Sequence, residues 1–299
     1  MAFHLNPELP VAEELKRVLR EEMQAAAQQL RAAAQGNGDE AVHEARKSVK
    51  KIRATLRLVQ ANLGDAYAEK NAEFGEIGRT LSELRDAAAM LETYDELRKH
   101  YESHVDEVVW TGLRRLLMKQ KRDTEKAVSN VAAFQNYPRQ LDAAAQHVED
   151  WPLRGKQFDT IAPGLIKAFR RGRQAMKRAQ KTPSSEHFHE WRKRVKDHWY
   201  HMRLLQPIWG DMMDAYGGVL KDMQMWLGND HNLAVLRETI GDHRSLSPLV
   251  PVIEQHQARL RQWAFLAGLR VYGARPKQIV GTLKFLWNAP AERTKGAEP

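Results

Sequence analysis

The sequence predicts an all-α protein, built as two tandem antiparallel four-helix bundles, and three observations support this. No proline occurs between Pro10 and Pro138, and the residues between them are rich in Ala, Leu, Glu, Lys and Arg, which favour helices. Sustained alternation of apolar and polar residues, the pattern of a strand, is nearly absent. One segment of the first half also recurs in the second half.

Turn-forming residues divide the chain into about four long helices on either side of Pro152. In the first half the expected breaks are residues 34–40, 63–66, 136–140 and 149–155. In the second half they are residues 181–185, 209–213, 245–251 and 273–277. We therefore expect a first bundle over residues 1–152, a second bundle over residues 153–288, and a disordered tail over residues 289–299.

The internal repeat becomes clear when His43 is aligned with His189. The segment "VHEARKSVKKIRATLRL" (42–58) then lies on "FHEWRKRVKDHWYHMRL" (188–204), and 11 of the 24 positions from residue 42 to residue 65 are identical. The same shift places "LSELRDAAAM" (81–90) on "LGNDHNLAVL" (227–236). This similarity predicts that the two bundles arose by duplication and are related by a pseudo-twofold axis.

The composition indicates an anionic partner. The chain of 299 residues carries 47 Lys and Arg against 38 Asp and Glu, a net charge of +9, and an isoelectric point near 9.6. The absence of cysteine excludes disulfides and thiolate metal sites. The N-terminal residues "MAFHLNPELP" do not resemble a signal peptide, and no apolar run is long enough to span a membrane, so we expect a cytoplasmic protein.

The repeated segment predicts an amphipathic helix with a cationic stripe. At about 100° per residue, the basic side chains of the first copy fall within an arc of about 120°, and the apolar residues lie on the other side. A solvated helix face normally mixes positive and negative charges, whereas this stripe repeats one sign in both copies. We therefore predict an anion-binding surface formed by His43, Arg46, Lys47, Lys50, Arg53 and Arg57, and by His189, Arg192, Lys193, Lys196 and Arg203.

Other basic residues could complete a central groove. The segment "FRRGRQAMKRA" (169–179) is a second basic helix, and two further basic residues occupy equivalent places in the other repeated element. Arg forms a planar fork suited to phosphate, Lys is a point charge, and His can switch its charge near neutral pH, so the set suits a row of phosphates. The additional candidates are Arg171, Arg173, Lys177, Arg85 and His231.

At these motifs the chain resembles the CHAD domain, the conserved histidine α-helical domain. The segments "HEARKSVKKIRATLRL", "HEWRKRVKDHWYHMRLL", "FRRGRQAMKRA", "LSELRD" and "LGNDHNLAV" carry the resemblance over nearly the whole chain. It implies two four-helix bundles around a basic groove, binding of inorganic polyphosphate, and association with polyphosphate granules in bacteria. The chain departs from the family pattern at Ser82 and Asn232, and its first half lacks the Arg-rich helix.

Parts of the sequence are also compatible with three other functions. A metal site could use His198 and His201, but the chain has no Cys and no His-Glu-x-x-His motif, so we predict none. Phosphoryl transfer would need carboxylates such as Asp86 or Asp230 for Mg²⁺, and no nucleotide-binding loop is present. Nucleic acid is the closest alternative, because its phosphates would suit the same surface and its bases could stack on an exposed aromatic ring. Trp191 is expected in the core because it shares the apolar face of its helix, whereas the sequence leaves open whether Trp199 is buried or exposed.

The sequence therefore predicts a non-catalytic protein, without cofactor or metal, that binds long-chain polyphosphate in the cytoplasm or at polyphosphate granules. The alternative is a general polyanion-binding or nucleic-acid-binding protein. If His43 and His189 contact phosphate, affinity should increase between about pH 8 and about pH 6, because a nearby anion favours the imidazolium form.

Overall fold

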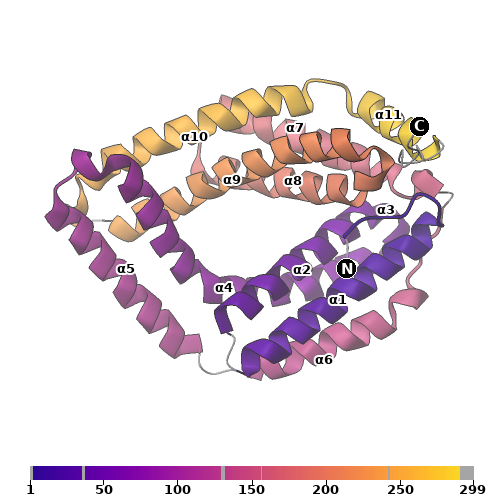
Figure 1. Ribbon diagram of the computed structural model, residues 1–299, viewed down its shortest axis with the longest axis horizontal. Coiled ribbons are helices and arrows are strands. Elements are labelled where there is room, and N and C mark those ends of the chain that lie inside the picture. Colours follow the sequence, from indigo (N-terminus) through magenta and orange to yellow (C-terminus); the bar gives the residue numbers. More distant parts are fainter. Residues whose placement is uncertain (1–2, 36–37, 129–131, 156, 242, 290–299) are drawn as a thin grey trace, which may run out of the picture.

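The computed structural model describes residues 3–35, 38–128, 132–155, 157–241 and 243–289. For residue 39 and residues 83–88, 125–128 and 132–135, only the backbone is described. All regular secondary structure in these ranges is helical, which confirms the predicted all-α class (Figure 1). The tail predicted to be disordered lies, apart from residue 289, outside the described residues.

Up to residue 146, the described residues form six α-helices and a short 3₁₀ helix. Helix α1 packs against α2 and α6, and α2 also packs against α4. In α1 the buried residues Leu15, Leu19, Met23, Ala26 and Leu30 recur every three or four positions, so one face of the helix is apolar. The elements are α1 (Val11–Ala34), α2 (Gly38–Leu58), α3 (Gln60–Leu63), α4 (Ala66–Tyr101), η1 (Glu102–His104), α5 (Glu107–Val128) and α6 (Ala132–Gln146).

From residue 148 onward the chain forms a series of antiparallel helices, in which α8 packs against α7 and α9, and α10 packs against α9 and α7 (Figure 1). Helix α8 begins where the Ser184 hydroxyl accepts a hydrogen bond of 3.2 Å from the backbone N–H of His187, a typical N-cap. The elements are η2 (Val148–Asp150), η3 (Gln157–Thr160), α7 (Ala162–Lys181), α8 (Ser185–Leu204), η4 (Gln206–Ile208), α9 (Gly210–Ile240), η5 (Arg244–Leu246), α10 (Leu249–Tyr272) and α11 (Pro276–Asn288).

Two clusters of buried apolar side chains hold the helices together, and both clusters combine the two halves of the chain. The larger cluster joins α1, α2 and α6 to α7, α8 and α11, with parts of α4, α9 and α10. The second joins the C-terminal half of α4 and helix α5 to the end of α9 and the start of α10. The halves are thus joined at two places, and a domain boundary at residue 152 stays a prediction.

One expected break is absent from the structure, and one break in the structure was not expected. Pro138 was expected to interrupt the chain but lies inside α6, because burial of Leu141 and Ala145 against α1 offsets the backbone hydrogen bond that the proline removes. Conversely, the break between α4 and α5 at η1 was not predicted, because residues 102–106 contain no proline or glycine. Helix α4 therefore extends over 36 residues and reaches α9 and α10 of the second half.

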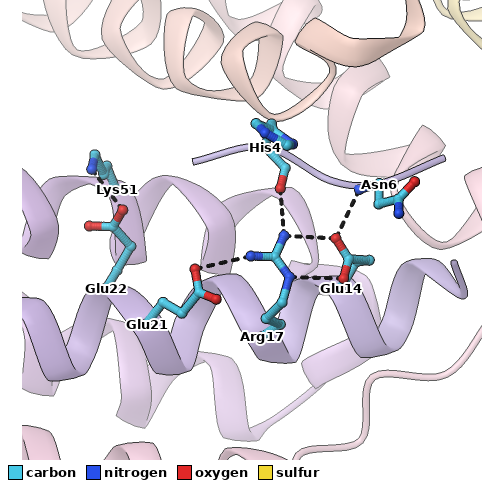
Figure 2. A network of polar contacts seen from close by, with 7 residues as sticks. All are labelled: His4, Asn6, Glu14, Arg17, Glu21, Glu22 and Lys51. Atoms are coloured by element: carbon cyan, nitrogen blue, oxygen red, sulfur yellow. Dashed lines mark hydrogen bonds and ion pairs between the residues drawn. The ribbon is translucent and has the colours of Figure 1, made fainter. Parts of the chain in front are cut away.

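An extended segment at residues 3–6 ties α1 to α8 (Figure 2). The backbone N–H of Leu5 donates to the carbonyl oxygen of Leu204 at 2.8 Å, at the end of α8. On the other side, Arg17 of α1 donates to the carbonyl oxygen of His4 at 2.8 Å, and its neighbour Glu14 accepts from the backbone N–H of Asn6 at 2.8 Å. The segment therefore bridges an early helix and a late helix of the chain.

Candidate anion-binding site

The two basic helices predicted from the repeat, α2 and α8, lie against each other near their C-terminal ends. Arg57 Nη1 of α2 lies 2.9 Å from Asp197 Oδ1 of α8, and His201 Nε2 of α8 lies 2.8 Å from the carbonyl oxygen of Ala54. Close to these contacts, the side chains of Lys50 of α2 and Lys196 of α8 are near enough for each to alter the pKa of the other. The stripes of the two copies therefore face each other at equivalent lysines.

A glycine allows this close approach. Gly164, in the first turn of α7, lies against the end of α2, and a Cβ atom there would collide with the carbonyl oxygen of Leu58. Alanine or any larger residue would push α7 away from α2. Because α7 packs along α8, the same contact fixes where α8 lies relative to α2. The position of the two stripes thus depends on backbone-to-backbone contact at residue 164.

The paired lysines have strongly perturbed acidity. Burial, followed by the nearby charges of Lys196 and Arg46, lowers the pKa of Lys50 well below its usual range. Burial, followed by Arg192, lowers the pKa of Lys196 to about 8. The two arginines are themselves equivalent residues of the repeat, one from each helix. Two lysines and two arginines therefore concentrate positive charge at the contact between the two helices.

Helices α4 and α9 flank this centre on either side. A Cβ atom on Gly75 of α4 would lie 3.3 Å from a guanidinium nitrogen of Arg53, and one on Gly228 of α9 would lie 3.5 Å from Nε of Arg192. The small residues of the flanking helices thus leave room for the arginine side chains. Burial, and then the charge of Arg57, lowers the pKa of Arg53.

His189 behaves differently from a free imidazole. The rings of His189 and His231 lie 4.1 Å apart between their centroids, so α8 and α9 present two histidines at one place. Burial, then the neighbouring His231 and Lys193, lowers the pKa of His189 to about 4. His189 is therefore neutral in the ligand-free protein at neutral pH. An increase in affinity towards pH 6 that depends on His189 requires the anion to raise this pKa.

Several predicted residues have partners within the protein. Lys47 lies 2.5 Å from Glu44, and Lys193 lies 3.8 Å from Glu190, so each cation at the edge of the stripe has a carboxylate three residues earlier. Arg57 is paired with Asp197, which also accepts from Arg194 at 3.3 Å. These pairs moderate the field of the stripe, and the charge of Asp197 also acts on Lys196 near its centre. His43 and Arg46 make further interactions within the protein.

The Arg-rich helix α7 does not present all its cations to the stripe. Arg171 lines a hollow between α7 and α8, on the flank of α8 that carries Arg194 and His187. At about 100° per residue, Arg173 and Lys177 are turned away from Arg171 by about 120–160° around the axis of α7. Their place in the predicted set of binding residues stays a prediction. The side chain of Arg85 lies outside the described part of the chain.

The aromatic residues near the stripe are packed within the protein. Trp191 is fully buried, which confirms its predicted place in the core. Trp199 is half-buried, with the guanidinium of Arg203 5.1 Å from its ring centroid. The same guanidinium lies 5.6 Å from the ring of Phe3, in the N-terminal segment. The guanidinium of Arg203 therefore lies close to two aromatic rings at the C-terminal end of the stripe.

Sequence reasoning missed the contribution of Asp197 and His201 to the contact between α2 and α8. The alignment of the two copies contains one indication that Asp197 has a special role. Its equivalent in the first copy is Lys51, a residue of opposite charge. Lys51 instead pairs with Glu22 of α1 at 2.7 Å (Figure 2). The equivalent residues Lys51 and Asp197 thus have opposite charges and stabilise different contacts, with α1 in the first copy and with α2 in the second.

Of the residues considered for a metal site or for phosphoryl transfer, His198 and Asp230 make other contacts in the structure. Within these ranges, no group of three His, Asp or Glu side chains is placed to hold a metal ion. His198 is buried against Phe169, with ring centroids 4.1 Å apart, and burial lowers its pKa to about 3. Asp230 accepts from Arg261 Nε at 2.6 Å and is buried. Also within the described part, no helix has the length and apolar character needed to cross a membrane.

The fold and the paired stripes define an all-helical protein in which two repeat-related basic helices meet face to face. The CHAD domain family model matches residues 10–241, from the start of α1 to the end of α9. The chain belongs to the CHAD domain family. A search of curated protein sequences finds no match.

Proposed function

We propose that this protein binds inorganic polyphosphate without chemical turnover, along the cationic stripes of α2 and α8. The observation that carries the proposal is the contact between Lys50 and Lys196, with Arg46 and Arg192 beside it. The family to which the chain belongs is associated with polyphosphate binding. Association with polyphosphate granules in a bacterial cytoplasm is part of the same proposal.

The energetics of the lysine pair support an anionic ligand. Burial first, and then the neighbouring cations, lower the pKa values of both lysines, so keeping both side chains charged in this place costs free energy. A polyanion between the helices would replace repulsion with charge-assisted hydrogen bonds and restore ordinary protonation. The arrangement is thus unfavourable in the free protein and favourable when an anion is bound.

Polyphosphate fits the site better than single-stranded nucleic acid. Proteins that bind single strands combine a basic groove with exposed aromatic rings on which bases stack. The aromatic candidate Trp199 instead packs beside Tyr200, with ring centroids 4.8 Å apart, and against the Arg203 guanidinium. Its equivalent in the first copy is Arg53. A ligand that offers phosphates without bases makes full use of the stripe and needs no stacking surface.

The first test is a competition titration at physiological salt. Labelled long-chain polyphosphate is bound and then challenged with equal phosphate equivalents of single-stranded DNA, RNA and triphosphate. We expect unlabelled polyphosphate to compete far better than the nucleic acids, and the affinity to fall steeply with salt, as in binding that releases several counterions. Equal competition by nucleic acid would favour the general polyanion alternative, and a flat salt response would refute electrostatic binding.

The affinity should also decrease as the pH rises above about 8, because of Lys196. A bound anion favours the ammonium form and so raises the lowered pKa of Lys196. Below about pH 8, Lys196 is already protonated in the free protein, so binding needs no further proton. Above about pH 8, Lys196 must take up a proton when the anion binds, and this lowers the affinity. Calorimetric titrations in buffers of different ionisation enthalpy measure the number of protons taken up when polyphosphate binds.

The matched control is Lys196→Arg, which keeps the positive charge at every pH of the experiment. We expect this variant to bind polyphosphate with a weaker pH dependence above pH 8 than the parent protein. If the decrease persists unchanged in Lys196→Arg, another group causes it, and the assignment to Lys196 is wrong.

A further inference from the structure

A hollow of about 590 Å³ lies between α7 and α8, apart from the cationic stripe. A volume of this size is typical of pockets that hold small molecules. At about 100° per residue, its lining residues on α8 are turned about 100–160° around the helix from His189 of the stripe. The hollow therefore lies on another flank of α8. Its polar lining consists of Arg171, Gln174, Arg178, His187, Glu190 and Arg194.

The two helices supply this lining in the same pattern. They are joined by the short turn at residues 182–184, so they run antiparallel and pack side by side (Figure 1). Each helix contributes three polar residues at positions i, i+3 and i+7, which share one face. Arg171 and Arg194 also line a small cavity beside Gly164, so they lie together at one end of the hollow. Arg178 and His187, next to the turn, form the other end.

Both ends of the hollow are cationic, whereas its middle offers hydrogen-bonding groups. Seven positions separate Arg171 from Arg178, which places their Cα atoms about 10 Å apart along α7. Neither arginine has a carboxylate partner among the described residues. Between them lie the amide of Gln174 and the carboxylate of Glu190, which accepts hydrogen bonds from hydroxyl groups and repels phosphate. The lining therefore favours a ligand with an anionic group at each end and hydroxyl groups in between.

Contacts within the protein position the polar groups of α8 in this hollow. Nδ1 of His187 lies 2.6 Å from the carbonyl oxygen of Thr182, so Nδ1 carries the hydrogen and Nε2 remains for a ligand. Nε of Arg194 lies 2.9 Å from Oε1 of Glu190, and its Nη1 lies 3.3 Å from Oδ2 of Asp197. These two carboxylates hold the guanidinium in place at its end of the hollow.

The lining gives no support for binding a nucleotide base. None of the described residues that line the hollow is Phe, Tyr or Trp, so it lacks the aromatic surface on which bases stack. A polyol needs only donors and acceptors of hydrogen bonds, which the middle of the hollow provides.

We propose that this hollow is a separate binding site for small polyols that carry a phosphate group at each end, as sugar bisphosphates do. One phosphate contacts Arg171 and Arg194, whose planar guanidinium groups suit phosphate oxygens. The other phosphate contacts Arg178 and accepts a hydrogen bond from Nε2 of His187 in its imidazolium form. The hydroxyl groups between the phosphates donate to Glu190. A ligand with a single phosphate reaches only one cationic end.

Calorimetric titration of the whole protein with fructose 1,6-bisphosphate, fructose 6-phosphate and inorganic phosphate tests the class of ligand. We expect the bisphosphate to bind at least about tenfold more tightly than fructose 6-phosphate, because only the bisphosphate contacts both ends. Inorganic phosphate should bind more weakly still. Equal affinities for the two sugar phosphates would refute recognition at two ends. Inorganic phosphate that binds as tightly as fructose 6-phosphate would refute the contacts to the hydroxyl groups.

The variant Arg178→Gln tests the location of the site. It removes one cationic end and should lower the affinity for fructose 1,6-bisphosphate at least about tenfold. Arg139→Gln makes the same charge change on an exposed residue of α6 and should leave this affinity unchanged. Thermal unfolding verifies that both variants are folded. If Arg178→Gln binds the bisphosphate as tightly as the parent protein, the ligand binds elsewhere and the inference is wrong.

A titration in the presence of saturating polyphosphate separates this inference from the proposed function. We expect the affinity for fructose 1,6-bisphosphate to fall by at most about threefold, since physiological salt screens charges beyond about 8 Å. Complete displacement of the bisphosphate by polyphosphate would refute a separate site and leave the proposed function intact. A protein that binds the bisphosphate through Arg178 but does not bind polyphosphate would support the inference and refute the proposed function.

Discussion

Replacing Lys50 with glutamate is expected to stabilise the ligand-free protein while it weakens polyphosphate binding at least about tenfold. The carboxylate would face Lys196 and lie near Arg46 and Arg192, so a repulsive contact becomes an ion pair. We expect a gain of about 1 kcal/mol in the free energy of unfolding, typical of a partly screened pair. The same carboxylate repels phosphate at the centre of the stripe. Stability and affinity therefore move in opposite directions.

Thermal unfolding and polyphosphate titration of the same preparations test this expectation. Lys119→Glu makes the same charge change on an exposed residue of α5 and should have only a small effect on either quantity. Lys50→Met removes the charge without forming a pair, and its affinity should lie between those of the parent and Lys50→Glu. A Lys50→Glu variant that is less stable but binds as tightly as the parent would show that Lys50 is structural and lies outside the binding surface.

The second large effect is expected at Gly164. Substitution with alanine places a Cβ against the carbonyl oxygen of Leu58, and both partners are backbone, so neither can rotate away. Overpacking of this kind costs about 1–3 kcal/mol and sometimes more. Because the contact sets the approach of α7 and α8 to α2, polyphosphate affinity should fall together with stability. Chemical denaturation measures the first quantity and titration the second.

Gly217→Ala is the matched control for this substitution. Gly217 lies in α9, where a Cβ would meet no atom within 4 Å. Alanine is the better helix former, and we expect Gly217→Ala to stabilise the protein by about 0.5–1 kcal/mol. If Gly164→Ala is as well tolerated as Gly217→Ala, the contact between α7 and α2 does not set the geometry of the stripes.

The sequence predicted the features that depend on local pattern. The all-α class was predicted from the helix propensity of the residues. The break near Gly64 was predicted from its turn-forming residues, and in the structure Gly64 adopts a φ of +53°. The cationic stripes followed from helical periodicity, and Trp191 was placed in the core because it shares the angle of Ala45. Each of these conclusions needs only the nearest few turns of one helix.

The remaining features depend on contacts between distant parts of the chain. No local pattern shows that Lys50 meets Lys196, because periodicity gives the face of a helix but not its neighbour. The partners of Arg57 and Lys51 were missed for the same reason, since both lie on other helices. The long reach of α4 and the continuation of α6 through Pro138 likewise follow from tertiary packing, which overrides local signals.

The N-terminal segment has a consequence for the order in which the protein is made. The backbone N–H of Leu5 donates to the carbonyl oxygen of Leu204, at the end of α8. This carbonyl group emerges from the ribosome only after both basic helices, α2 and α8, have been translated. Until then the segment can bind α1 through Asn6 and Glu14 but cannot reach its second partner. Contacts between such distant residues close late in folding. Docking of this segment on α8 should therefore follow the assembly of the second group of helices, and nascent chains that stop before residue 204 should leave it accessible to proteases.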